Sequence, residues 1–205
     1  MLEGISCAGK TSTMYAIKRL FATDLNLERN IIMLGEHYTQ VLNSINGELK
    51  NHEHIEHTEM LFKRVEMIEQ LYEWACHLGD FRRSSRGLYT VLERGLINHT
   101  AYYEDYDTKQ IKELVRRFKA LEVEAIVLII SDEHLEKRIR QRDELMKISN
   151  TSSFYREQAE KAKKYQDNML SATNKTNLPF RIICTDAMDW DEYARVIVNS
   201  SNMEK

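Results

Sequence analysis

The sequence predicts a three-layer α/β/α fold, in which helices cover both faces of a parallel sheet of about five strands. One proline and seven glycines are the only such residues among 205, so long helices are expected. Short apolar runs rich in β-branched residues alternate with segments whose apolar side chains recur every three or four positions. This alternation of strand and helix patterns predicts a parallel sheet that is buried on both faces.

The predicted strands are short apolar runs at residues 31–34, 88–92, 125–130 and 180–184. Helices are predicted between them, most clearly over 61–75 and 111–118. A further strand is expected at the start of the chain, but only Met1 and Leu2 precede Glu3 there. Because a strand usually has about five residues, we expect the first strand to be truncated and residues upstream of Met1 to be missing.

The composition is that of an ordinary globular protein. Hydrophobic residues make up 42%, charged residues 30%, and the net charge is -3, which excludes a disordered tail and a strongly basic nucleic-acid binder. Cys7, Cys76 and Cys184 form no Cys-x-x-Cys pair, so neither a disulfide framework nor a zinc ribbon fits. The longest apolar stretch, 125–130, is far shorter than the roughly 20 residues of a membrane span. We expect a cytoplasmic protein with one domain, 1–205, and no nucleic-acid or membrane partner.

A phosphate-binding loop is predicted near the N-terminus. Residues 4–11, GISCAGKT, match the Walker A pattern Gly-x-x-x-x-Gly-Lys-[Ser/Thr]. The glycines let the backbone curl so that successive N–H groups point at phosphate oxygens, and the following helix adds its positive end. Lys10 then reaches the β- and γ-phosphates, and the Thr11 hydroxyl can bind Mg²⁺. The loop predicts nucleotide binding; a glycine-rich turn before a helix is the alternative.

Charged residues follow two of the predicted strands. Glu36 comes just after 31–34, and Glu93 and Arg94 come directly after 88–92. Ligands of open α/β sheets bind at the carboxyl ends of strands. There a carboxylate suits a hard cation and a guanidinium suits phosphate oxygens. The alternatives are an ordinary exposed glutamate and a structural ion pair.

Two polar segments complete the pattern. Residues 131–170 are mostly charged or polar, and they are predicted to form two exposed helices joined by a turn, either a solvated hairpin or a lid over transferred phosphates.

His52, His54 and His57 lie close together in the sequence. Zinc could bind two of them on one helix face, but no further ligand cluster supports a metal site. The prediction for this segment is therefore a solvated helix.

These motifs together resemble the thymidylate kinase-like branch of the P-loop nucleoside and nucleotide kinases. The start, 3–12, is also similar to that of deoxynucleoside kinases. Residues 93–102 resemble the family's Asp-Arg-Tyr followed by Ala-Tyr, and 137–147 resemble its lid run Arg-x-Arg-Gly-Glu-Leu-Asp-Arg. Residues 154–165 are similar to its Phe-x-x-Arg…Tyr helix, and 184–187 resemble its adenine-side loop. The resemblance covers nearly the whole chain in order.

The resemblance implies a P-loop kinase fold with a lid at about 138–155, ATP as donor and Mg²⁺ as the required ion. Arg94 would hold the acceptor, and Arg142 would neutralise charge in the transition state, because the loop itself has no arginine. Glu36 stands where nucleoside kinases keep their general base. The catalytic candidates are thus Lys10, Arg94, Arg142 and Glu36. The expected donor-binding residues are Gly4, Cys7, Ala8, Gly9, Lys10, Thr11, Ser12 and Lys147.

For the acceptor, the resemblance implies that Phe62 stacks on the base and Tyr102 packs against the sugar, beside Glu36 and Arg94. Thr11 and Glu93 are the expected metal ligands. Thymidylate-specific members carry an arginine where this chain has Glu66. An acceptor-only carboxylate facing thymine O4 would disfavour dTMP and favour a base with an exocyclic amine.

The function expected from these features is ATP-dependent phosphoryl transfer to a nucleoside monophosphate. A deoxynucleoside kinase acting on a 5'-hydroxyl and a nucleotide-binding switch without kinase activity are the alternatives. The partner is a nucleotide or nucleoside substrate. Homodimerisation is left open, since the sequence does not give the oligomeric state.

Overall fold

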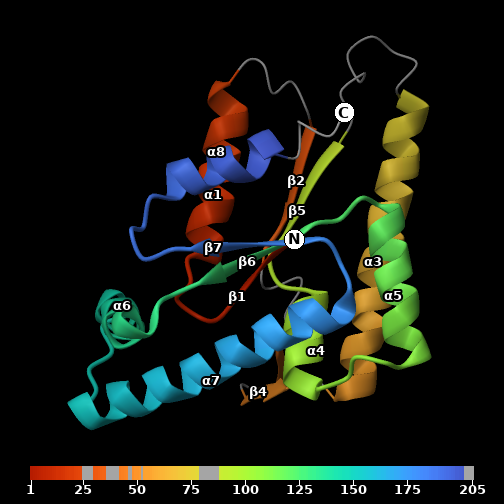
Figure 1. Cartoon of the computed structure of the whole chain (residues 1–205). Coiled ribbons are helices and arrows are strands. Elements are labelled where there is room, and N and C mark those ends of the chain that lie inside the picture. The colour runs from red at the N-terminus through yellow and green to blue at the C-terminus, as the bar shows by residue number, and fades with distance from the viewer. Residues whose placement is uncertain (25–29, 36–41, 46–47, 52, 79–87, 201–205) are drawn as a thin grey trace.

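The computed structural model describes residues 1–24, 30–35, 42–45, 48–51, 53–78 and 88–200 (Figure 1). The parallel strands are β1 (Leu2–Gly4), β2 (Asn30–Leu34), β5 (Leu88–Leu92), β6 (Ala125–Ile129) and β7 (Phe180–Cys184). The helices are α1 (Lys10–Thr23), α3 (His54–Leu78), α4 (Leu96–Tyr103), α5 (Lys109–Ala120), α6 (Asp132–Leu145), α7 (Ser152–Thr176) and α8 (Trp190–Ser200). An antiparallel hairpin of β3 (Leu42–Ile45) and β4 (Glu48–Asn51) lies outside this sheet.

The parallel strands follow one another in the order β2-β5-β1-β6-β7. β6 pairs with β1 on one side and with β7 on the other, and β2 pairs with β5. A parallel bridge between Leu2 and Glu93 joins β5 to β1, and the Arg94 N–H donates to the Leu2 carbonyl at 2.8 Å. The prediction of about five parallel strands is confirmed. β1 has three residues where each of the other four has five, as expected for a truncated first strand.

Helices cover both faces of the sheet. Figure 1 shows α1 and α8 together on one side, and α3, α5 and α7 on the other. Right-handed crossovers require this division, because the chain moves from β1 to β2 in one direction across the sheet and from β2 towards β7 in the other. The buried core between these layers includes Ile17, Leu61, Ile97, Leu114 and Leu128. In the described part of the chain, no helix combines the length and apolar character that a membrane span requires.

The strands begin and end close to where the sequence predicts them. The runs 88–92 and 180–184 are observed with those bounds, and the other two differ by one residue at one end. The β3–β4 hairpin was not predicted. Its signal is Asn46-Gly47 between two short runs, a dipeptide typical of two-residue hairpin loops.

A cavity of about 200 Å³ opens at the amino ends of the central strands. Its walls come from β5, from the residues that precede β6, and from Met1, Leu2 and Ile17. The residues that follow the carboxyl ends of the strands, where the predicted chemistry lies, do not line it. We therefore place the candidate site at the opposite edge of the sheet.

Candidate active site

The phosphate-binding loop joins β1 to α1 at the carboxyl edge of the sheet. Gly4 has φ 147°, and a Cβ there would lie 2.6 Å from the Leu128 carbonyl oxygen. Gly9 has φ 86°, and a Cβ would lie 2.2 Å from the Trp190 ring. Only glycine fits at both ends of the loop. Since α1 begins at Lys10, its first amide groups and its positive end face the loop, as anion binding requires.

Lys10 and the lid arginines converge on this loop. The Lys10 side chain is buried and folds back, so that Nζ donates to the Ile5 carbonyl at 3.0 Å. Arg142 Nη1 donates to Ser6 Oγ at 3.0 Å, and Arg138 Nη2 donates to the Cys7 carbonyl at 2.7 Å. Both arginines belong to α6, which Figure 1 shows beside the end of β1. The structure thus brings the predicted lid arginine Arg142 to the predicted phosphate loop.

Thr11 and Glu93, the predicted metal ligands, also meet. The Thr11 hydroxyl donates to Glu93 Oε1 at 2.7 Å, although the two residues are far apart in the sequence. The β5–β1 bridge pairs Glu93 with Leu2, the first residue of the three-residue strand β1, so Glu93 lies close to the loop that follows Gly4. A hydroxyl and a carboxylate are hard oxygen donors, the kind that Mg²⁺ prefers. The donor set therefore fits this ion.

Arg94 follows Glu93 in a strained backbone conformation, with φ 63°, which is uncommon for a non-glycine residue and concentrates at functional sites. Its side chain is buried, and Nη1 donates to Asn98 Oδ1 at 2.9 Å. The hydroxyl of Tyr165 on α7 donates to the same Asn98 oxygen at 2.8 Å. Asn98 and α7 therefore fix the direction in which this guanidinium points.

Arg64 on α3 is a buried cation that the sequence did not reveal. Its Nε, Nη1 and Nη2 atoms are all buried and have no hydrogen-bond partner among the described residues. Burial lowers its pKa to about 10, and the nearby Glu3 carboxylate opposes this shift. Glu3 is buried as well; its Oε1 accepts from the Ile97 N–H at 3.1 Å, and burial raises its pKa from the usual 4.5 to about 7. A carboxyl group with a pKa of about 7 carries only part of its negative charge at neutral pH, so it compensates the Arg64 charge incompletely.

Phe62 and Glu66 lie on a different face of α3. The Arg117 guanidinium of α5 lies over the Phe62 ring, 5.9 Å from its centroid, and the exposed Glu66 carboxylate also acts on Arg117. Two helical positions correspond to a turn of about 200°, so Arg64 points away from this face and towards Glu3. Glu66 is exposed on this face, and its role in reading the base stays a prediction.

Other predicted residues are spread more widely. Tyr102 is exposed and meets the Tyr103 ring edge-on, with centroids 4.8 Å apart. Lys147 is exposed at the end of α6, two turns beyond Arg138 and its contact with the loop. Ala8 is buried in the loop, and Ser12 lies in the first turn of α1. Glu36 falls outside the described residues.

The predicted lid, 138–155, comprises the end of α6, the turn 146–151 and the start of α7. It is not simply a solvated hairpin, because Arg138, Ile139, Asp143 and Tyr155 are buried. Arg138 is a residue that the sequence analysis passed over. It also donates to the Thr185 carbonyl at 2.9 Å and lies 5.3 Å from the Trp190 ring centroid. The signal was its spacing, since Arg138 and Arg142 stand four residues apart on one helix face.

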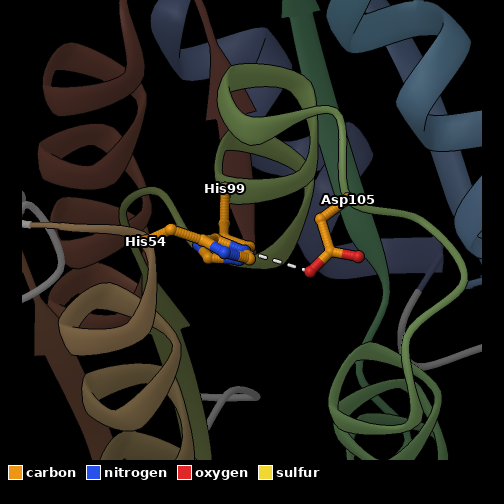
Figure 2. A group of neighbouring side chains, drawn as sticks. All are labelled: His54, His99 and Asp105. Carbon is orange, nitrogen blue, oxygen red and sulfur yellow. Dashed lines mark ion pairs between the residues drawn. The ribbon is translucent and has the colours of Figure 1, made fainter.

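Three histidines pack together where α3 meets α4, contrary to the prediction of a solvated helix. His57 and His99 are buried, with their Nδ1 atoms 2.9 Å apart, and His54 Nε2 lies 3.0 Å from Asp105 Oδ2 (Figure 2). Burial, followed by the charges of His57 and His54, lowers the pKa of His99 to about 3. His99 is therefore neutral near pH 7. His52 lies outside the described residues.

Comparison with solved structures identifies the fold. The crystal structure of the YorR protein from Bacillus subtilis, in complex with phosphorylated GDP, aligns with 99% of this chain and 95% of that chain at 14% identity and a TM-score of 0.60. Deoxyadenosine kinase from M. mycoides with bound dCTP aligns with 98% of both chains at 15% identity and a TM-score of 0.42. No protein-family model and no curated protein matches the sequence. At these identities the likeness concerns the architecture alone. The chain shares its overall fold with the YorR protein.

Proposed function

We propose that this protein is a kinase that transfers the γ-phosphoryl group of ATP to a nucleoside monophosphate. The observation that carries the proposal is the convergence of three predicted parts at one edge of the sheet. The phosphate loop, the Thr11–Glu93 pair and the lid residue Arg142 come from three distant segments and meet there. Phosphoryl transfer depends mainly on positioning and on stabilising charge, and these are the parts that it needs.

Each part has a role in this proposal. The loop amides and Lys10 hold the donor phosphates, with Gly4, Cys7, Ala8, Gly9 and Ser12 shaping the loop and Lys147 reaching the donor when the lid closes. Thr11 and Glu93 hold Mg²⁺, which would neutralise charge on the phosphate oxygens. Arg142 already touches the loop through Ser6, so it is close to where charge develops. Arg94 orients the acceptor beside Tyr102.

Arg64 supports an anionic acceptor. A buried guanidinium without hydrogen-bond partners is costly unless a ligand supplies them. Phosphate and carbonyl oxygens both match its fork of donors. A nucleoside monophosphate carries both kinds of acceptor, whereas a nucleoside lacks the compensating charge. This comparison favours the monophosphate over the nucleoside as substrate.

Two other functions make different predictions for the same assay. A deoxynucleoside kinase would use Glu36 as a general base and would turn over nucleosides without a phosphate. A nucleotide-binding switch would hydrolyse ATP slowly and would not respond to any acceptor. The arginines at the loop favour a kinase over a switch, because a switch does not require Arg142 to face the donor phosphates.

The test is an ADP-release assay with MgATP across the common nucleosides and their monophosphates. We expect turnover with at least one monophosphate to exceed turnover with every nucleoside by at least about tenfold in kcat/KM. Comparable or better turnover with a nucleoside would establish the deoxynucleoside kinase instead. ADP release that no acceptor stimulates would overturn the kinase assignment.

The Arg64→Met variant tests the acceptor role directly. It keeps a long side chain but removes the charge and the donors, so the KM for the monophosphate should rise about 10- to 100-fold while the KM for ATP changes little. Arg116→Met is the matched control, because Arg116 on α5 is exposed and pairs with Glu113. An unchanged acceptor KM in Arg64→Met would remove Arg64 from the acceptor site.

We also propose that two copies of the chain associate through α3. Ile55, Met67 and Trp74 are exposed apolar side chains on this helix, and Met67 and Trp74 share a face because they are seven residues apart. Light scattering coupled to size-exclusion chromatography should then report a dimer, and Trp74→Glu should produce monomers. A monomeric wild-type protein at micromolar concentration would contradict the proposal.

A further inference from the structure

A second group of ligand atoms lies away from the phosphate loop. It joins the first turn of α3 to α4 and to the segment that follows α4. His54, His99 and Asp105 each contribute one nitrogen or oxygen atom, and these atoms all lie within 4.8 Å of one another. Figure 2 shows the three side chains directed towards the same space from different segments of the chain. The prediction of a solvated helix missed this group because two of its members lie far along the sequence.

The spacing of the ligand atoms is close to that of a zinc site. With bonds of about 2.0–2.1 Å and tetrahedral angles, neighbouring ligand atoms are about 3.3 Å apart. His54 Nε2 and Asp105 Oδ2 are 3.0 Å apart, so this pair needs little movement. The other separations in the group are at most 4.8 Å, so His99 has to approach by up to about 1.5 Å, a distance that rotations of the side chains can supply.

The polar atoms of the group support a metal rather than ordinary packing. His54 Nε2 is buried, yet among the described residues it has no hydrogen-bond partner, because its approach to Asp105 lacks hydrogen-bond geometry. The Asp105 side chain is only 10% exposed. The two groups form an ion pair when His54 carries a proton, and a metal ion would take the place of that proton between the imidazole nitrogen and the carboxylate.

His57 completes the arrangement as a positioning residue. Its Nδ1 lies 2.9 Å from His99 Nδ1, so one of these two nitrogens carries the shared proton. When His99 donates it, His99 Nε2 carries a lone pair, and binding a metal there replaces its 3.4 Å contact with the Thr58 hydroxyl, which donates to the His54 carbonyl at 2.8 Å. Metal-binding histidines commonly donate their other N–H in this way, which fixes the tautomer and the ring orientation.

We propose that His54, His99 and Asp105 bind one Zn²⁺ ion, with water as the exchangeable fourth ligand. Two imidazoles and one carboxylate suit a borderline-soft metal, whereas Mg²⁺ prefers oxygen ligands alone. The site is therefore chemically distinct from the Thr11–Glu93 pair. It stands on these side chains and does not depend on the proposed kinase activity.

The ion would tie three segments together. His54 begins α3, His99 lies on α4 and Asp105 follows α4. The residue before His99 is Asn98, whose side chain accepts from Arg94. Zinc at this position would hold α4 on α3 and so support the orientation of Arg94. We expect a structural ion that raises stability and lowers the acceptor KM, with no direct contact to the reacting phosphate.

The test uses tag-free protein that is stripped with a chelator and then titrated with ZnCl₂ or CoCl₂. Metal content after dialysis is measured by mass spectrometry, and tetrahedral Co²⁺ is detected by its intense visible absorption. The variants are His54→Ala and Asp105→Asn. His54 is partly exposed, and asparagine has the same shape as aspartate, so both variants should fold. His77→Ala is the matched control, because His77 is an exposed histidine at the other end of α3.

We expect one Zn²⁺ per wild-type chain, retained in a large excess of Mg²⁺. At 100-fold excess over its Kd, zinc should raise Tm by about 5 to 10 °C. Each ligand variant should bind at least about tenfold more weakly and lose the Co²⁺ spectrum, while His77→Ala binds as the wild type does. Wild-type protein that retains no stoichiometric zinc, or folded His54→Ala and Asp105→Asn proteins that bind it unchanged, would overturn the proposal.

Discussion

Lys10 is the side chain whose charge the donor phosphates require. It is buried and donates to the Ile5 carbonyl, a neutral acceptor that a phosphate oxygen can replace. Lys10→Ala should therefore reduce kcat/KM for ATP by about 10³-fold or more while the circular dichroism spectrum stays unchanged. Lys18→Ala on the exposed side of α1 is the control and should be fully active. A folded Lys10→Ala enzyme with wild-type turnover would refute the kinase proposal.

Glu3 should make stability depend on pH. Burial raises its pKa from 4.5 to about 7 in the folded protein, so between these values the folded state keeps a proton that the unfolded state has lost. The stabilising effect of the neutral form is complete below about pH 4.5 and is lost as the pH rises through 7. Glu3→Gln keeps the acceptor for the Ile97 N–H and cannot ionise. The variant should gain on the order of 3 kcal/mol over wild type by pH 8.

Urea denaturation at pH 5 and pH 8 measures this effect. The difference in unfolding free energy between Glu3→Gln and wild type should be small at pH 5 and large at pH 8. Equal differences at the two pH values would show that Glu3 has an ordinary pKa in the folded protein.

Single residues were predictable where the pattern is local. The Walker A spacing located Lys10 and Thr11 without any knowledge of the fold, and the end of a buried strand located Glu93. Arg64 was not predictable, because its importance comes from the face of α3 that packs towards Glu3. The family resemblance predicts Glu66 in the acceptor pocket, and in the structure the Glu66 carboxylate is exposed and acts on Arg117.

The α6 helix presents its arginines to the phosphate loop as one unit. Arg138 is buried and binds two backbone carbonyls, so it anchors the helix, whereas Arg142 is half-buried and pairs with Ser6 and Asp143. Arg142 can therefore exchange these contacts for phosphate. We expect Arg142→Ala to lower kcat by about 10³-fold and to change the KM for ATP much less.

Lys137→Ala is the control for this prediction, since Lys137 is an exposed residue of the same helix. Steady-state kinetics at saturating acceptor separates kcat from KM. If Arg142→Ala loses affinity for ATP and keeps its kcat, Arg142 acts in ground-state binding of the donor. That result would leave the transition-state charge to other residues.

The bounds of helices and strands were easier to predict than which side of each helix is buried. Strands such as 88–92 are short runs rich in apolar, aromatic and β-branched residues, so their bounds follow from the sequence. The hairpin β3–β4 has mixed polarity and depends on its turn, which is why periodicity missed it. The histidines of α3 look like a solvated surface until α4 packs against them, an outcome that depends on tertiary structure.

At the scale of the whole molecule, the sheet order explains why distant residues meet. β1 lies between β5 and β6, so the residues that follow these strands are brought to the phosphate loop. The cavity at the opposite edge lies beside the short strand β1 and far along the strands from this chemistry. The order of strands follows from right-handed crossovers once the helices are assigned. Right-handed crossovers do not fix which side of each helix packs against the sheet. The burial of Arg64 depends on that side.

Arg64 links function to the stability of the whole molecule. Among the described residues no hydrogen bond offsets the burial of this charge, so it costs stability in the ligand-free protein, and replacing even buried ion pairs by apolar residues of similar volume often stabilises a protein by about 1–4 kcal/mol. Arg64→Met should therefore raise the Tm of the free protein by several degrees. The acceptor should then stabilise the variant much less than the wild type, because its anionic group no longer relieves that charge. Thermal unfolding with and without the best monophosphate measures both effects, and Arg116→Met should show neither. A lower Tm for ligand-free Arg64→Met would mean that the guanidinium is a structural element of the core. A higher Tm, together with a weaker response to the acceptor, would identify the guanidinium as a binding group that the fold keeps at a cost in stability.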